Sequence, residues 1–140
     1  MSKVAVVYWS GTGNTEAMAK AVAAGAEAAG AEVTVCGPDA FGPEQIAQYD
    51  GIAFGCPAMG AEVLEEDDFD PMWQDVKNAL GDTPIVLFGA YGWGDGEWMR
   101  LWDEEARAAG CNLASDFVIA NESPDDTALA ACRALGKALV

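Results

Sequence analysis

The sequence predicts a single α/β domain over residues 1–140, with an open parallel sheet covered by helices on both faces. Short apolar segments rich in β-branched residues alternate along the chain with longer segments of helical spacing. This alternation is typical of strand–helix–strand units with right-handed crossovers. The chain has 140 residues, of which 51% are hydrophobic, so it is long enough to bury the core of one domain.

Five short apolar runs bounded by turn residues predict the strands. They are Lys3–Tyr8, Val33–Cys36, Ile52–Cys56, Pro84–Phe88 and Asp116–Ala120. The first is apolar nearly throughout and does not alternate with polar residues, so we expect both of its faces to be buried.

Five helical segments follow these strands. They are Glu16–Ala29, Pro43–Gln48, Asp70–Leu80, a helix that carries Trp98 and Ala106 and ends before Gly110, and Ser123–Leu139. Met18, Val22 and Ala26 share one face of the first helix, and Gly30 supplies its end. Ser123-Pro124 predicts an N-cap followed by the first helical residue of the last helix.

The charge and cysteine content exclude several classes of protein. With 23 acidic residues, 7 basic residues and no histidine, the net charge is −16, which argues against binding to nucleic acid or to anionic membranes and favours basic partners. No apolar run reaches the roughly 18 residues of a membrane span, and we expect a cytoplasmic protein. The spacing of Cys36, Cys56, Cys111 and Cys132 suggests neither a zinc site nor a redox dithiol, so we expect small buried residues.

The segment that joins the first strand to the first helix predicts an anion site. It reads Ser10-Gly11-Thr12-Gly13-Asn14-Thr15, and backbone N–H groups of a tight loop at a helix N-terminus can hold a phosphate. It lacks the Gly-Lys-Ser/Thr ending of a nucleoside triphosphate loop and the third glycine of a dinucleotide loop. A permanently bound monophosphate is therefore favoured. The alternative is a turn that only caps the helix.

Two further loops leave the carboxyl ends of predicted strands, where ligands bind in such sheets. They span residues 57–70 and 89–95, and they carry Met59 and Trp93. A planar ligand could stack between these two side chains, although each alone could simply cap the core. The lack of a histidine and of a nucleophile with a partner base suggests that a bound cofactor performs the chemistry.

Four motifs together resemble one family, the short-chain flavodoxins, and most closely those of the clostridial type. They are Tyr-Trp-Ser-Gly-Thr-Gly-Asn-Thr at 8–15, Ala-Met-Gly at 58–60 with Glu-Val-Leu-Glu-Glu at 62–66, Tyr-Gly-Trp-Gly-Asp-Gly at 91–96, and Asn121-Glu122. The resemblance covers nearly the whole chain. It implies a flavodoxin-like three-layer α/β/α sandwich with strand order 2-1-3-4-5 and a tightly bound, non-covalent FMN. The implied function is low-potential one-electron transfer between soluble redox enzymes, by a semiquinone/hydroquinone shuttle, and not an enzymatic activity.

The resemblance also implies a role for each matching residue. Ser10, Thr12, Asn14 and Thr15 would hold the FMN phosphate, and Met59 and Trp93 would enclose the isoalloxazine ring. The carbonyl of Gly60 would turn over to accept from flavin N5–H in the semiquinone, Glu62 would accept from N3–H, and Asn121 would lie near the ribityl chain or ring edge. The full implied set is Ser10, Gly11, Thr12, Gly13, Asn14, Thr15, Pro57, Ala58, Met59, Gly60, Ala61, Glu62, Ala90, Tyr91, Gly92, Trp93, Gly94 and Asn121.

Three positions depart from the family pattern. Family members commonly have Ser at the position of Pro57, Asp at that of Ala61 and often Ser at that of Ala90. Because Pro57 and Ala90 lack the hydroxyl groups of these Ser residues, the affinity for FMN would depend more on backbone groups. Because Gly60 and Glu62 are present, we expect the semiquinone to remain populated.

Acidic residues crowd the expected mouth of the site. They are Glu62, Glu65, Glu66, Asp67, Asp68 and Asp70, joined by Asp95 and Glu97. Such charges would disfavour the anionic reduced flavin and steer redox partners with basic docking surfaces, although part of the cluster could be a plain solvated rim. We expect a monomer. The alternatives are an FMN sensor or storage protein and a small flavin-dependent quinone or nitro reductase, for which the sequence offers no basic patch.

Overall fold

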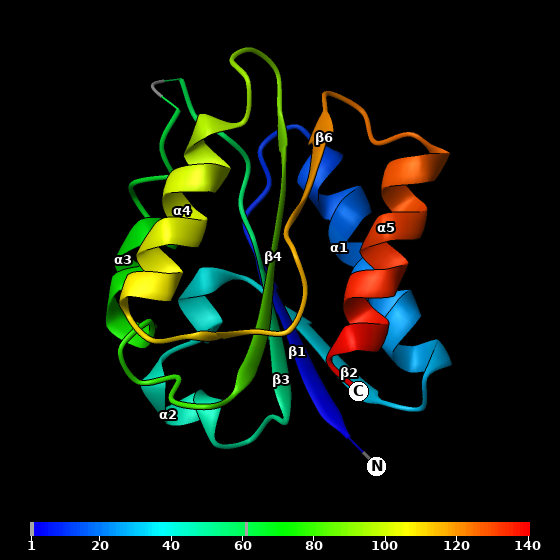
Figure 1. Cartoon of the computed structure of the whole chain (residues 1–140), viewed down its shortest axis with the longest axis vertical. Helices are drawn as coiled ribbons and strands as arrows, with labels where there is room; N and C mark the ends of the chain where they lie inside the picture. Colours follow the sequence, from blue (N-terminus) through cyan, green and yellow to red (C-terminus); the bar gives the residue numbers. More distant parts are fainter. Residues whose placement is uncertain (1, 61) are drawn as a thin grey trace.

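The computed structural model describes residues 2–60 and 62–140, and its centre is one parallel sheet (Figure 1). The strand order is β2-β1-β3-β4, and the far side of β4 pairs with both β5 and β6. The strands are β1 (Lys3–Tyr8), β2 (Glu32–Cys36), β3 (Gly51–Gly55), β4 (Pro84–Tyr91), β5 (Asn112–Leu113) and β6 (Val118–Asn121). The predicted order 2-1-3-4-5 is confirmed, with the fifth strand in two pieces.

Helices form a layer on each face of the sheet, as Figure 1 shows. On one side lie α1 (Asn14–Ala28) and α5 (Asp126–Ala138), and on the other lie α3 (Phe69–Val76) and α4 (Glu97–Ala108). A 3₁₀ turn, η1 (Pro38–Ala40), and the short α2 (Pro43–Ile46) follow β2. The three-layer α/β/α sandwich is therefore confirmed. No helix among the described residues has the length and apolar character needed to cross a membrane.

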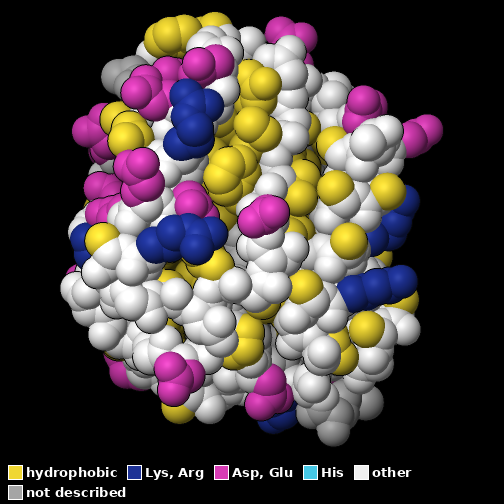
Figure 2. All heavy atoms as spheres, in the orientation of Figure 1, with side chains coloured by type: hydrophobic (Ala, Val, Ile, Leu, Met, Phe, Trp, Pro, Cys, Tyr) yellow, Lys and Arg dark blue, Asp and Glu magenta, His cyan; other side chains and the backbone are white. Residues whose placement is uncertain are grey.

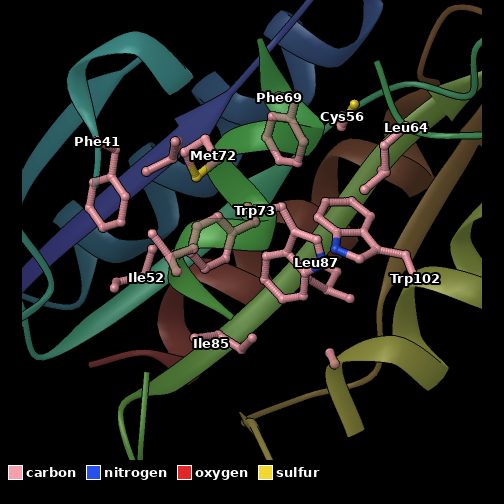
Figure 3. Close-up of a cluster of buried hydrophobic side chains, with 14 of the residues drawn as sticks. Phe41, Ile52, Cys56, Leu64, Phe69, Met72, Trp73, Ile85, Leu87 and Trp102 are labelled. Carbon is pink, nitrogen blue, oxygen red and sulfur yellow. The ribbon is translucent and has the colours of Figure 1, made fainter. Parts of the chain in front are cut away.

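The core on the α3/α4 side is built from aromatic side chains (Figure 3). Trp73 packs edge-to-face on Phe54 and on Trp102, with ring centroids 5.4 and 5.8 Å apart, and Trp102 does the same with Phe69 at 5.4 Å. The indole N–H of Trp73 donates to Glu105 Oε1 at 2.8 Å. Since edge-to-face pairs fix ring orientation, this cluster holds α3 and α4 firmly beneath the loops that precede them.

The predicted start of the fifth strand, at Asp116, is wrong. The chain pairs with β4 at Asn112–Leu113, leaves the sheet, and pairs again over Val118–Asn121. Residues 114–116, between the two pieces, are Ala-Ser-Asp and are exposed. They offer no large apolar side chain to bury against a helix layer, so this stretch does not continue the strand.

The predicted start of the last helix is also wrong. Helix α5 begins at Asp126, and Asp125 is its N-cap, with Oδ1 accepting from Ala128 N at 2.8 Å. Ser123 and Pro124 precede the cap and follow Glu122, which has a left-handed φ of 59°. Asp and Ser cap helices about equally well, so the turn at Glu122 decides which of the two reaches the capping position.

All four cysteines are free, but only two are buried. Cys56 and Cys132 are fully buried, and burial raises the pKa of each thiol to about 12. Cys36 and Cys111 are only half-buried, so the expectation that all four are buried is wrong for these two. Cys36 ends β2 at the margin of the sheet, and Cys111 lies in the turn after α4.

Candidate functional site

The three loops singled out in the sequence meet around one cavity of about 450 Å³ at the carboxyl ends of β1, β3 and β4. The first loop contributes a polar end and the other two contribute flat, mostly apolar walls. The lining residues are Trp9, Gly11, Thr12, Asn14, Pro57, Ala58, Met59, Ala90, Tyr91, Gly92 and Glu122. This is the edge of the sheet at which the strand order predicts a ligand.

The first loop is held in shape by two of its own hydroxyl groups. Ser10 Oγ accepts from the backbone N–H groups of Gly13 and Glu16 at 3.1 and 3.3 Å. Thr15 is buried, and its Oγ1 accepts from Ala90 N at 3.3 Å. Thr12 instead lines the cavity, where α1 begins. No Lys or Arg of the described chain lines the cavity, so an anion bound there would depend on backbone N–H groups, the helix dipole and short polar side chains.

The second loop is tied to β4 and closed by a tight turn. Cys56 N donates to Phe88 O at 3.1 Å and Ala58 N to Ala90 O at 3.0 Å, which extends the β3–β4 pairing into the loop. Met59 O accepts from Glu62 N at 2.8 Å. Gly60 lies in this turn, and apart from Gly60 and its two chain neighbours no described atom comes within 4 Å of the place that a Cβ atom would take there. Ala61 lies outside the described residues.

Glu65 is a buried structural carboxylate and not a member of the acidic rim. Its side chain accepts from the N–H groups of Asp67, Asp68 and Phe69 at 2.8, 2.8 and 2.7 Å. Its own N–H donates to Cys56 Sγ at 3.3 Å. Burial alone raises the pKa of Glu65, but the three N–H donors outweigh burial and hold the pKa below its ordinary value. The carboxylate thus joins the end of the second loop to the start of α3.

The third loop carries Trp93 on its outer side. This side chain is 63% exposed and does not line the cavity. Arg100 holds the loop from α4, with Nη1 donating to Asp95 O and Nη2 to Asp95 Oδ1, each at 2.9 Å. At the end of β6, the exposed Asn121 donates from Nδ2 to Gly92 O at 3.5 Å. Trp93 is therefore free to cover a ligand held between the loops.

Glu62 provides the one polar side-chain atom of these loops that is buried without a partner among the described residues. Its Oε1 is inaccessible to solvent and accepts no hydrogen bond from them. A buried carboxylate oxygen without a donor costs free energy until a ligand or water supplies an N–H or O–H group. The amides at the start of α1 suit a phosphate, and the flat apolar walls suit the ring of FMN. Glu62 lies beside the cavity and does not line it, and its unpaired oxygen is an acceptor that a ring N–H group of FMN would suit.

The predicted site residues that the structure describes divide into two groups, and Ala61 belongs to neither because it lies outside the described residues. Those that line the cavity are Gly11, Thr12, Asn14, Pro57, Ala58, Met59, Ala90, Tyr91 and Gly92. Those that lie in or beside the same loops without lining it are Ser10, Gly13, Thr15, Gly60, Glu62, Trp93, Gly94 and Asn121. The prediction omitted Trp9 and Glu122, although each is adjacent to a predicted residue in a quoted motif.

Comparisons with known proteins agree with this geometry. The family model described as Flavodoxin matches residues 6–136. A flavodoxin of Megasphaera elsdenii is 42% identical over 135 residues, covering 96% of each chain, and one of Clostridium beijerinckii is 39% identical over 121 residues, covering 86% of this chain and 88% of its own. The solution structure of two-electron reduced Megasphaera elsdenii flavodoxin superposes with a TM-score of 0.88 over 97% of each chain, at 42% identity. The chain thus belongs to the flavodoxin family, the FMN-containing electron-transfer proteins.

Proposed function

We propose that the cavity between the three loops holds one FMN non-covalently, and that the protein carries single electrons at low potential without transforming a substrate. The observation that carries this proposal is the convergence of the polar first loop and the two apolar loops on one cavity of about 450 Å³. Bound FMN supplies the redox chemistry, by taking up and releasing electrons.

Each loop has a distinct task in this proposal. Thr12, Asn14 and the amides at the start of α1 bind the phosphate, while Ser10 and Thr15 keep that loop in shape. Met59 and Trp93 cover the two faces of the ring and exclude water from it. Glu62 supplies an acceptor for a ring N–H group. Gly60 lets the peptide that follows it rotate, because a glycine tolerates both turn conformations.

The first loop predicts a strong preference for FMN over riboflavin, which lacks the phosphate. Charge-assisted hydrogen bonds contribute about 1.5–3 kcal/mol each, so we expect riboflavin to bind the apoprotein at least about 100-fold more weakly, as measured by quenching of flavin fluorescence. The variant Thr12→Val should weaken FMN binding and leave riboflavin binding unchanged. Equal affinities for the two flavins would contradict the assigned phosphate site.

The same FMN-loaded protein tests the carrier function. In an anaerobic potentiometric titration, a single-electron carrier passes through two separate one-electron steps. A single two-electron step would favour the sensor, storage or reductase alternatives.

We propose further that redox partners dock with basic surfaces on the acidic side of the second loop. A groove of about 490 Å³ lies between this loop, α3 and α4, and no Lys or Arg among the described residues lines it. Its carboxylates are Glu62, Glu66, Asp70 and Glu105. Val63 and Leu101 add exposed apolar surface to the same groove, and Figure 2 shows acidic side chains gathered on the side of the molecule where α4 lies.

Charge reversal on this groove is expected to slow electron transfer to a basic acceptor. For the double variant Glu66→Lys, Asp70→Lys, we expect the rate constant for reduction of a small basic haem protein to fall about tenfold at low ionic strength. The difference from wild type should shrink as salt rises. The control Glu27→Lys, Glu32→Lys makes the same change in net charge at exposed positions of α1 and β2 outside the groove, and it should change the rate less than about twofold. Equal effects of both variants would show that only net charge matters.

We propose that residues 1–140 act as one domain and as a monomer in the cytoplasm. A net charge of −16 supports a monomer, since chains of high like charge repel one another. Four free cysteines support a reducing compartment. Sedimentation of the FMN-loaded protein tests the monomer.

A further inference from the structure

The second and third loops touch through the carboxyl group of Glu62 and the backbone of Gly94. A Cβ atom placed on Gly94 would lie 2.6 Å from Glu62 Cδ and 3.3 Å from Cγ, and it would overlap Oε1. The same Oε1 is the buried oxygen that has no hydrogen-bond donor among the described residues. The carboxyl group therefore occupies the space that any side chain at position 94 would need.

Both sides of this contact are fixed by other interactions. Glu62 follows a tight turn in which Met59 N donates to Val63 O at 2.9 Å, and its own φ is left-handed at 53°. Gly94 precedes Asp95, which Arg100 holds through its backbone and side-chain oxygens, each at 2.9 Å. The atoms in the way belong to the far end of the Glu62 side chain, so a side chain at position 94 would displace this carboxyl group while both loops keep their bonds.

We propose that Gly94 is a positioning residue. Because Gly94 has no side chain, it leaves room for the carboxyl group of Glu62, and Oε1 stays directed to a ring N–H donor of FMN. The inference rests on the proposed FMN site. Gly94 does not touch FMN in this proposal, and it acts only through Glu62.

Glycine at position 94 also relieves backbone strain, since its φ of 86° is unfavourable for other residues. The chain offers a matched control for this effect. Gly110, in the turn after α4, has a φ of 82°, and apart from its two chain neighbours a Cβ atom added there would meet no described residue within 4 Å. Gly110→Ala therefore introduces similar strain without displacing a carboxyl group.

The test is a double-mutant cycle on FMN affinity with Gly94→Ala, Glu62→Ala and the double variant. Flavin fluorescence gives the dissociation constant, and thermal unfolding of each apoprotein gives its stability. We expect Gly94→Ala to weaken FMN binding about tenfold or more when Glu62 is present, and less than about twofold in the Glu62→Ala background. Gly110→Ala should lower the unfolding temperature and leave the dissociation constant within about twofold of wild type.

Three results would overturn the proposal. They are an unchanged FMN affinity in Gly94→Ala, an equal loss with and without Glu62, and an equal loss in Gly110→Ala. If Gly94→Ala does not fold, recovery of the fold in the double variant supports the clash with Glu62, and failure to recover it refutes the clash. A wild-type apoprotein that binds no FMN would overturn the proposed function, whereas a wild-type protein that binds FMN with no coupling overturns this inference alone.

Discussion

Replacing Gly136 by alanine is expected to destabilise the apoprotein by about 2–3 kcal/mol, as overpacking of a closed interface does, even though alanine is the better helix former. Gly136 lies in α5 where this helix crosses α1, and a Cβ there would overlap the carbonyl oxygen of Val22 and lie 2.6 Å from Ala26 N. Both obstacles are backbone atoms, so no rotamer change can relieve them. The two helices would have to move apart.

Urea denaturation of the variant and of a matched control measures this effect. Ala134 lies in the same helix and is exposed, so Ala134→Gly should cost about 1 kcal/mol through helix propensity alone. Helix propensity alone predicts that Gly136→Ala raises the free energy of unfolding and that Ala134→Gly lowers it. The close crossing of α1 and α5 predicts instead that both variants lower it. A Gly136→Ala protein as stable as wild type, or more stable, would show that the helices can separate at little cost.

Replacing Glu65 by glutamine is expected to lower the free energy of unfolding by about 3 kcal/mol at neutral pH. The reason is that a neutral amide with one acceptor oxygen replaces a buried carboxylate that accepts from three N–H groups. The bonds to Asp67, Asp68 and Phe69 at 2.8, 2.8 and 2.7 Å join the second loop to α3. Glu66→Gln is the matched control. Its side chain is exposed, and we expect a change of about 0.5 kcal/mol or less.

The effect of Glu65 depends on pH with a definite sign. Its pKa is lowered in the folded protein, so its contribution to stability is fully present above the unfolded pKa of about 4.3. That contribution is lost as the pH falls through the lowered pKa of the folded state. The difference in unfolding free energy between wild type and Glu65→Gln should therefore shrink as the pH is lowered from about 6 toward about 3. A constant difference over this range would contradict the lowered pKa.

Local patterns in the sequence were sufficient for most elements and for the position of the site. The apolar run of β1 predicts its bounds, Lys3–Tyr8, without error, because burial on both faces needs nothing beyond apolar composition. Gly30, with a φ of 99°, ends the first helical segment as predicted. The loops after β1, β3 and β4 meet because parallel strands place their carboxyl ends at one edge of the sheet.

Tertiary structure alone decided which polar groups find a partner. Glu65 and Glu66 are neighbours in one acidic run, yet the first is 5% exposed and bonded to three N–H groups while the second is exposed. Similarly, Ser123 and Asp125 are both good caps, and the turn at Glu122 selects Asp125.

The contacts of Gly94 and Gly136 likewise separate what the sequence predicts from what only the tertiary structure decides. Composition and periodicity are properties of neighbouring residues, so the sequence by itself determined most of the strands and helices and the three loops that form the site, but not the two pieces of the fifth strand or the start of α5. Close approach between segments far apart in the chain depends on how the layers pack. The seat of the Glu62 carboxyl group on Gly94 and the crossing of α1 and α5 at Gly136 therefore followed only from the tertiary structure.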